Sequence, residues 1–181
     1  TGTQPINLGA ASDDANGSTF DLSKASIEGI TADTIQIGSD TVTGNIALAG
    51  DLTLSSSLDL RTQGFVSAAG QTISLSNKDL RINATGVVDT GSVAAGLGNI
   101  VVASGDEATV SGAVAGSNIS ISSTDVDITG TITAAADGIV TLAPSDNSAV
   151  EIAGTGSGST FDVSAVELGQ ITSGGLVVGT T

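Results

Sequence analysis

Carboxylates and hydroxyls are the main side chains here that could do chemistry, because the sequence has no His or Cys and only four Lys or Arg. It therefore lacks a soft-metal site, a Ser–His or Cys–His nucleophile pair, and any side chain with an ordinary pKa near neutrality. Neighbouring carboxylates can support glycoside hydrolysis or bind Ca²⁺. The candidate pairs are Asp125 with Asp127, Asp106 with Glu107, and Asp13 with Asp14.

Each acidic pair also has a structural interpretation. Sugar sites usually add aromatic platforms and cations to the carboxylates, and this chain has three Phe but no Trp or Tyr. The Ca²⁺ candidates match neither an EF-hand loop nor the Gly-Gly-x-Gly-x-Asp repeat, and Asp is common at solvated corners. We therefore expect no catalytic, cofactor-binding or metal-binding residue and no enzyme activity. A polysaccharide-acting β-helix enzyme is the less favoured alternative.

The charge balance limits the partners. Nineteen Asp and Glu against four Lys and Arg give a formal net charge of −15. Phosphate binding needs clustered cations, and an acidic surface repels anionic lipid headgroups. No stretch approaches the ~18 apolar residues of a membrane-spanning helix. We expect no nucleic-acid partner and no membrane insertion.

The clearest charged repeat consists of the triplets Asp59-Leu60-Arg61 and Asp79-Leu80-Arg81. In a strand, the Asp and the Arg of one triplet face the same side. If successive coils place the triplets in register, Asp59 stacks on Asp79 and Arg61 on Arg81 in an outward charge ladder. Alternating opposite charges would offset like charges held ~5 Å apart. The alternative is a docking spot for a glycan or a protein partner.

The charged side chains described above must be positioned by the secondary structure, and the sequence shows short runs in which aliphatic and polar residues alternate. Ile35-Gln36-Ile37, Ile73-Ser74-Leu75 and Ile119-Ser120-Ile121 each alternate aliphatic with polar residues. Gly, Asn, Asp and Ser, which tolerate corner conformations, interrupt the runs. This pattern predicts short strands with one buried face. The expected core ladder, which recurs about every 20 residues, is Leu60, Leu80, Ile100, Ile119 and Ile139.

Such a period predicts an all-β fold, a parallel β-helix or β-solenoid with about 20 residues per coil. Parallel crossovers are overwhelmingly right-handed, so we expect a right-handed coil. Residues 1–181 would form one continuous segment of roughly nine coils, and a rise of ~4.8 Å per coil gives a rod about 43 Å long.

A longer repeat is superimposed on the coils. Residues 17–38 match residues 158–179 at nine of 22 positions, beginning with Gly17-Ser18-Thr19-Phe20-Asp21 and its copy at 158–162. After a three-residue slip, Ile6-Asn7-Leu8 also aligns with Val150-Glu151-Ile152. The sequence predicts a tandem module of about 141 residues, in which 158–181 starts the echo of 17–40. Phe20 and Phe161 occupy equivalent positions, and we expect both in the core.

Threonine rows suggest one other surface, since flat β-helical faces of Thr can bind ice. The chain contains Thr41-Val42-Thr43 and Thr131-Ile132-Thr133. The rows do not recur in every coil, so we do not expect a regular threonine face.

The segment 166–179 resembles the recurring E-L-x-x-I-T-x-G-x-L-x-I-G phrase of filamentous-haemagglutinin-like exoproteins, and Ser26–Gly38 is a looser copy. In that copy Glu28 and Gly29 disturb the E-L pair, and Asp33 replaces a Gly. The resemblance implies a repeat region of a large bacterial adhesin, exported by two-partner secretion with an outer-membrane partner. It also implies an extracellular or cell-surface location and a long right-handed β-helical fibre.

These observations together predict a non-catalytic structural shaft that presents or spaces binding regions. Its partners would be adjacent modules of the same chain or identical subunits, with a host-surface or glycan receptor as a further possibility. The alternative within the same class is a subunit of a homopolymeric extracellular matrix, biofilm or surface filament.

Overall fold

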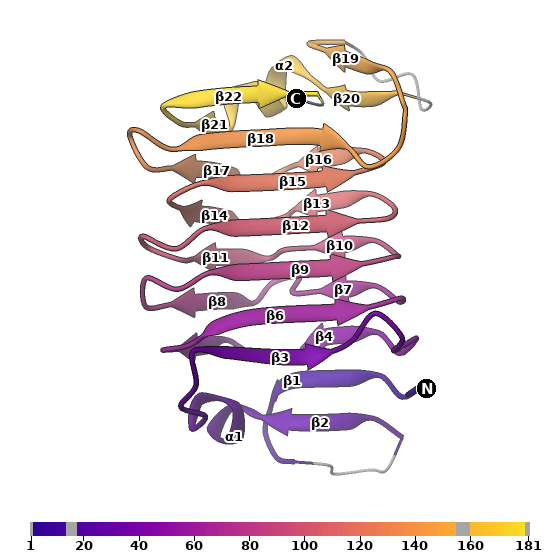
Figure 1. Cartoon of the computed structure of the whole chain (residues 1–181), viewed down its shortest axis with the longest axis vertical. Helices are drawn as coiled ribbons and strands as arrows, with labels where there is room; N and C mark the ends of the chain where they lie inside the picture. Colours follow the sequence, from indigo (N-terminus) through magenta and orange to yellow (C-terminus); the bar gives the residue numbers. More distant parts are fainter. Residues whose placement is uncertain (1, 14–17, 155–159, 180–181) are drawn as a thin grey trace.

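The computed structural model describes residues 2–13, 18–154 and 160–179, which form a β-solenoid of about five turns (Figure 1). Each turn contributes one strand to each of three long sheets, and all strand pairs within the described residues are parallel. In Figure 1 the near strands run from left to right, and the chain returns along the far side before rising to the next turn.

The sheets follow from this winding. The first contains, in spatial order, β16 (Val126–Ile128), β13 (Ala108–Val110), β10 (Val88–Asp89), β7 (Val66–Ser67), β4 (Ile46–Leu48), β1 (Ile6–Ala10) and β2 (Phe20–Ser23). The second contains β21 (Ile171–Thr172), β17 (Thr131–Ala134), β14 (Ala113–Gly116), β11 (Ser92–Ala94), β8 (Thr72–Leu75) and β5 (Leu52–Leu54). The third contains β22 (Gly175–Val178), β18 (Ile139–Pro144), β15 (Ile119–Ser123), β12 (Ile100–Ser104), β9 (Leu80–Ala84), β6 (Ser57–Thr62) and β3 (Thr34–Gly38). A separate pair joins β19 (Val150–Ile152) to β20 (Phe161–Val163).

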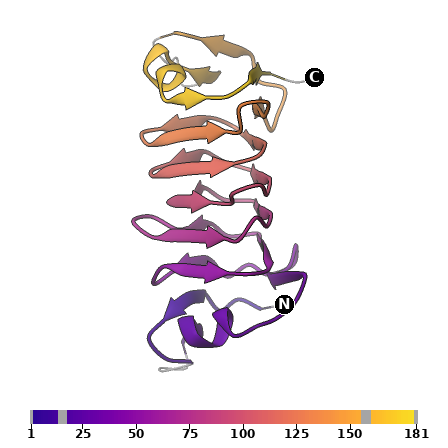
Figure 2. The same cartoon turned by 90° about the vertical axis from the view of Figure 1, so that its left-hand side faces the viewer.

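The predicted number of nine coils is wrong. Complete three-strand turns run only from β4 to β18, which is residues 46–144. The residues on either side build two end units, each with a short helix, α1 (Lys24–Glu28) and α2 (Ala165–Gly169). Figure 2 shows the stacked turns between these two end units. Dividing the whole length by one coil length overestimated the count, because the end units use many of their residues for helices and connections.

Alternation of buried and outward side chains creates the core. In β12, Ile100 and Val102 are buried, while Val101 and Ala103, which alternate with them, are partly exposed. Each buried aliphatic side chain stacks on its counterpart one turn away, and removing its apolar surface from water contributes roughly 1.5–3 kcal/mol. The core is therefore a set of ladders, and each turn depends on its neighbours.

The observed ladder differs from the predicted one in two places. Leu58, not Leu60, lies opposite Leu80, and the row continues through Ile100 and Ile119 to Val140. Leu60, Leu80, Ile100 and Ile119 are all buried, although Leu60 belongs to the adjacent row opposite Ile82.

Ile139 was expected to continue the row but is 46% exposed. The turn that leads from Ile119 to its partner Val140 is one residue longer than the sequence period predicted. Because strand side chains alternate with a period of two, that extra residue turns Ile139 outward and places Val140 inside.

The two end units have matching local structures at equivalent places of the longer repeat. Ser23 caps the N-terminus of α1 by accepting from the Ser26 N–H, and Ser164 caps α2 by accepting from the Glu167 N–H. β3 and β22 follow the helices, and each is closed by a glycine with positive φ, Gly38 at 77° and Gly179 at 104°. Such a conformation favours glycine because L side chains clash there. Gly17, Gly158 and Ser159 of the echoed motif lie outside the described residues.

Phe20 and Phe161 do not share the expected burial. Phe161 is completely buried, whereas Phe20 is 48% exposed, so the prediction for Phe20 is wrong. β20 lies between β19 and β16, but β2 is the outermost strand of its sheet (Figure 1). Equivalent phenylalanines are thus buried in one end unit and exposed in the other. The difference follows from whether a complete turn packs against the strand that carries the phenylalanine.

Candidate functional site

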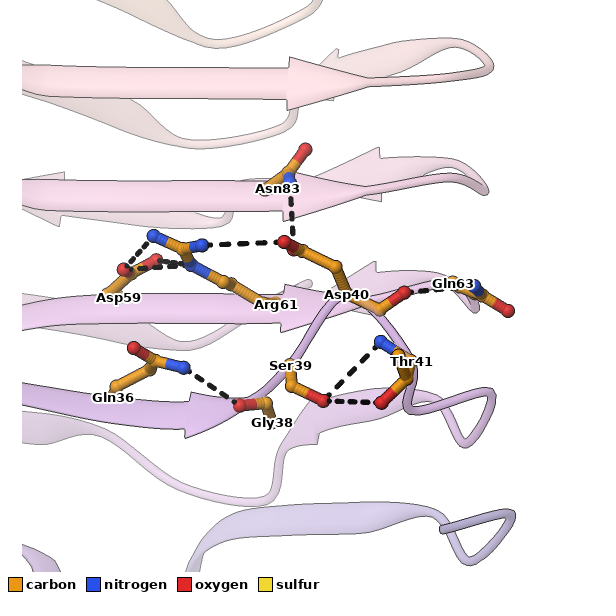
Figure 3. A network of polar contacts seen from close by, with 9 residues as sticks. All are labelled: Gln36, Gly38, Ser39, Asp40, Thr41, Asp59, Arg61, Gln63 and Asn83. Carbon is orange, nitrogen blue, oxygen red and sulfur yellow. Dashed lines mark hydrogen bonds and ion pairs between the residues drawn. The ribbon is translucent and has the colours of Figure 1, made fainter. Parts of the chain in front are cut away.

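A charged network crosses the turns that carry β3, β6 and β9 (Figure 3). Arg61 donates from Nη2 to Asp59 Oδ2 at 2.8 Å, and from Nε to both carboxylate oxygens at 3.0 and 3.1 Å. Its Nη1 lies 3.5 Å from Asp40 Oδ2, and Asn83 Nδ2 donates to Asp40 Oδ1 at 3.3 Å. Hydrogen bonding to Asp59, supported by its charge, raises the pKa of Arg61. The network therefore holds the loop that contains Asp40, just after β3, against β6 and β9.

The predicted charge ladder is wrong. The Cα of Asp59 lies opposite that of Arg81, and Arg61 lies opposite Asn83. Asp79 is not in the strand at all: it lies at the corner before β9, where its Oδ1 accepts from the Asn99 N–H at 2.7 Å. Because Leu80 pairs with Leu58 and not with Leu60, the two triplets are offset by two positions and like charges are not stacked.

Replacing Arg61 with Gln is expected to lower the midpoint of thermal unfolding by a few degrees. The change leaves the Asp59 side chain, which is only 12% exposed, without its cation. Arg81→Gln is the matched control, because Arg81 is exposed and forms no ion pair with any described residue. Circular dichroism melts at low salt would measure both. Equal midpoints for the two variants would contradict a stabilising role for the network.

The candidate acidic pairs bind the protein's own backbone and hydroxyl groups. Asp125 Oδ1 accepts from the Val126 and Asp162 N–H groups, each at 3.0 Å. Asp106 Oδ1 accepts from the Glu107 N–H at 3.1 Å. These bonds give Asp125 and Asp106 structural roles at corners. No group of His, Cys, Asp or Glu among the described residues has the geometry of a metal site.

Asp13 is similarly occupied. The Ser23 N–H donates to Asp13 Oδ1 and the Ser26 hydroxyl donates to Oδ2, both at 2.7 Å, and these bonds lower the pKa of Asp13. The carboxylate thereby ties its loop to the start of α1. Asp14, the other member of this pair, lies outside the described residues.

Asp162 has a carboxyl group in an unfavourable environment, and the sequence analysis did not single it out. Its Oδ1 is buried and has no hydrogen-bond partner among the described residues. Desolvation raises the pKa of Asp162, and repulsion from Glu151, Glu167 and Asp125 adds to this effect. At the equivalent place in the N-terminal unit, Asp21 instead accepts hydrogen bonds from Asn7 and Thr19. The sequence signal for this difference is the alignment of Asn7 with Glu151. The Asn7 amide donates to Asp21, whereas a second carboxylate, Glu151, lies opposite Asp162.

Asp162→Asn is expected to raise the midpoint of thermal unfolding at pH 7. A carboxyl whose pKa is raised in the folded state binds its proton more tightly there, so ionisation at neutral pH destabilises the fold. The gain should shrink as the pH falls, because a carboxyl with a raised pKa is protonated in the native protein before it is protonated in the unfolded chain. Melting curves from pH 4 to 7 measure the effect. Asp137→Asn removes the same charge at an exposed position, and an equal gain from it would refute the assignment.

A shallow hollow of about 230 Å³ lies on the outside of the first sheet. Phe65 and Val87, 38% and 46% exposed, form its apolar part, beside Asp89 and Thr109. Asp89 Oδ1 already accepts from the Gly91 N–H and the Ser111 hydroxyl. The hollow therefore has an apolar wall, but its lining residues do not include a set of converging polar groups of the kind that catalysis needs.

The threonine rows do not build a flat face. Thr131 and Thr133 lie in β17, but their neighbours in the turn below are Ala113 and Ala115. Thr43 lies outside the strands, where its N–H donates to Gly2 O. The threonines at these positions therefore do not stack into a continuous outward ladder.

The two ends of the solenoid combine outermost strands with exposed apolar side chains. β2 and β3 are the outermost strands at the N-terminal end, and Phe20 and Ile30, 48% and 39% exposed, lie there. At the other end β22 is outermost, and Leu176 and Ile152 are 41% and 55% exposed. Outermost strands carry backbone groups that can pair with another strand. We therefore regard the end faces as the candidate functional site.

No family model, curated protein or solved structure matches this chain. Among the described residues, no helix is long and apolar enough to cross a membrane.

Proposed function

We propose that the chain is a non-catalytic structural shaft, one continuous segment in a tandem array whose modules are about 141 residues long. The observation that carries the proposal is the pair of end units, which have the same strand–helix–strand order at opposite ends of the ladders. Aliphatic ladders running through about five turns make each turn a support for the next. The carboxylates of Asp13, Asp106 and Asp125 hold the backbone in place rather than converge on a cleft.

The larger setting that we propose is a secreted or surface-attached bacterial adhesin or fibre, related to filamentous-haemagglutinin-like exoproteins and exported through an outer-membrane partner. The shaft would hold binding regions, for a host-surface or glycan receptor, at a distance. Its formal charge of −15 would keep neighbouring rods apart over a screening length of ~8 Å. A right-handed coil is part of this proposal, and the rising path of the near strands in Figure 1 supports it.

The test is a two-module chain, in which residues 41–181 are repeated after residue 181. The third sheet gains six strands per module, from β6 to β22, so the rod should lengthen by about 30 Å at constant cross-section. Small-angle X-ray scattering measures both quantities. A two-module chain with a flexible joint, or with a thicker cross-section, would contradict the shaft.

The outermost strands at both ends also favour a second function of the same class, a subunit of a homopolymeric matrix or surface filament. Here separate single-module chains would join end to end. Sedimentation of the single-module chain over a range of concentrations separates the two. Filaments from single modules favour the polymer, and a monomer at all concentrations favours the covalent array.

A further inference from the structure

The C-terminal end unit shows how a unit of this kind sits on a complete turn. β21 pairs with β17, placing Ile171 opposite Ile132, and β22 pairs with β18, placing Leu176 opposite Val140. The Ile132 N–H donates to Gln170 O at 3.0 Å. The Gly175 and Gly179 N–H groups donate to Gly138 O and Leu142 O at 3.1 and 2.8 Å. β20 completes the contact above β16, where Phe161 is fully buried.

The N-terminal end unit has the same elements except a counterpart of β21, and among the described residues no turn lies beneath it. Ile30 and Thr31 correspond to Ile171 and Thr172 of β21, yet they form no strand. β3 corresponds to β22 and pairs with β6 on one side only. Phe20, the counterpart of the buried Phe161, is 48% exposed. These differences between the two units all lie on the side where β16, β17 and β18 are found in the C-terminal copy.

We infer that the N-terminal end face is a docking surface for a second copy of the turn β16–β17–β18, supplied by the neighbouring module. The register follows from the C-terminal unit: Ile132 of the neighbouring module lies opposite Ile30, Val140 opposite Ile35, and Leu142 opposite Ile37. This inference rests on the proposed array and deepens it, because it names the partner surface and its alignment. Docking would cover Phe20 and convert Ile30-Thr31 into a strand of the second sheet.

One residue of the N-terminal copy opposes close docking. Gly174 lies so near Ala136 O and the Asp137 backbone that a Cβ there would collide with them. The corresponding residue in the N-terminal unit is Asp33, whose carbonyl accepts from the Ser57 N–H. The incoming corner at 136–138 must therefore move aside for Asp33. Asp33→Gly should relieve the contact and strengthen the junction.

The experiment uses a chain in which residues 1–148 precede residues 5–181, so that the first β16–β18 turn meets the second N-terminal unit. The probes are the Thr34 and Gly38 amides of the second copy, the counterparts of Gly175 and Gly179. We expect their hydrogen exchange to slow at least tenfold relative to the single-module chain, and to slow further with Asp33→Gly. Amide exchange at Ile100 in both copies reports whether each shaft is folded.

Unchanged exchange at Thr34 and Gly38, both with Asp33 and with Asp33→Gly, would overturn the docking surface when Ile100 is protected in both copies. Protection only with Asp33→Gly would support the surface and identify Asp33 as its discriminating residue. The shaft is judged separately, because its test chain joins modules through residues 150–181. That chain can lengthen as a rod while this junction fails, and the two failures are then distinguishable.

Discussion

Leu80→Asp is expected to lower the free energy of unfolding by about 3–5 kcal/mol. Leu80 is completely buried and lies between Leu58 of the turn below and Ile100 of the turn above. A carboxylate there has no cation within the ladder, and it removes an apolar contact from both neighbouring turns. Guanidinium unfolding followed by circular dichroism at pH 7 would measure the loss.

The matched control is Leu97→Asp, the same substitution at a corner residue that is 76% exposed. We expect a change within about 0.5 kcal/mol for this variant, since exposed substitutions away from special features cost little. A loss below about 1 kcal/mol for Leu80→Asp would contradict the interior ladder. Hydrogen exchange would add detail, because the turns of β6 and β12 should both lose protection.

Gly91→Ala is expected to cost about 2–4 kcal/mol. Gly91 has φ of 56°, which L side chains rarely adopt, and a Cβ there would collide with Ala68 O and crowd Gln71 O. These carbonyls belong to the backbone of the preceding turn, so relief requires moving the corner of the coil. Denaturant unfolding of the purified variant is the appropriate measurement.

Gly70→Ala separates the two causes of this cost. Gly70 also has positive φ, 71°, but a Cβ there has no other atom within 4 Å. Its substitution should cost only the conformational penalty, about 1–2 kcal/mol. Equal losses for the two variants would mean that the close approach between turns at Gly91 contributes nothing.

The strand pattern was predictable because it depends on local alternation. Ile100-Val101-Val102 and Ile119-Ser120-Ile121 alternate inward and outward whatever lies around them, and their parallel stacking follows from the near-constant spacing. The exact register was not predictable from the spacing. Along the row from Leu58 to Val140, successive turns differ in length, the longest running from Leu58 to Leu80 and the shortest from Ile100 to Ile119, and the corners absorb the difference.

The error in the charge ladder has a clear physical reason. A slip of two residues leaves every side chain on its original face, so burial alone cannot distinguish Leu80 opposite Leu60 from Leu80 opposite Leu58. The observed register places Asp59 opposite Arg81, and the predicted one would have placed it opposite Asp79. Opposite charges across neighbouring strands are favoured over like charges. The repeated triplet therefore does not indicate which residues of the two strands lie opposite each other.

The exposure of Phe20 was not predictable from residues near it in sequence. The motif around Phe20 is the same as the motif around Phe161, and only the presence of β16 beside the second copy decides burial. The two copies of the echoed motif nevertheless share a local structure that the sequence analysis did not predict, since each is followed by a short helix capped by a Ser. Local sequence specified the unit, while its surroundings depended on the position of the unit in the stack.

The stacked arrangement of parallel turns has a mechanical consequence. The two end units lie at opposite ends of the stack, so tension between them acts along the axis, in the same direction as the hydrogen bonds between turns. Under such a load the bonds of one interface open in succession instead of resisting together in shear. An end unit would therefore peel away first, and each complete turn that follows would release about 20 residues, or ~70 Å of extended chain, before the next interface is loaded. A neighbouring module docked on each end would remove that starting point for peeling.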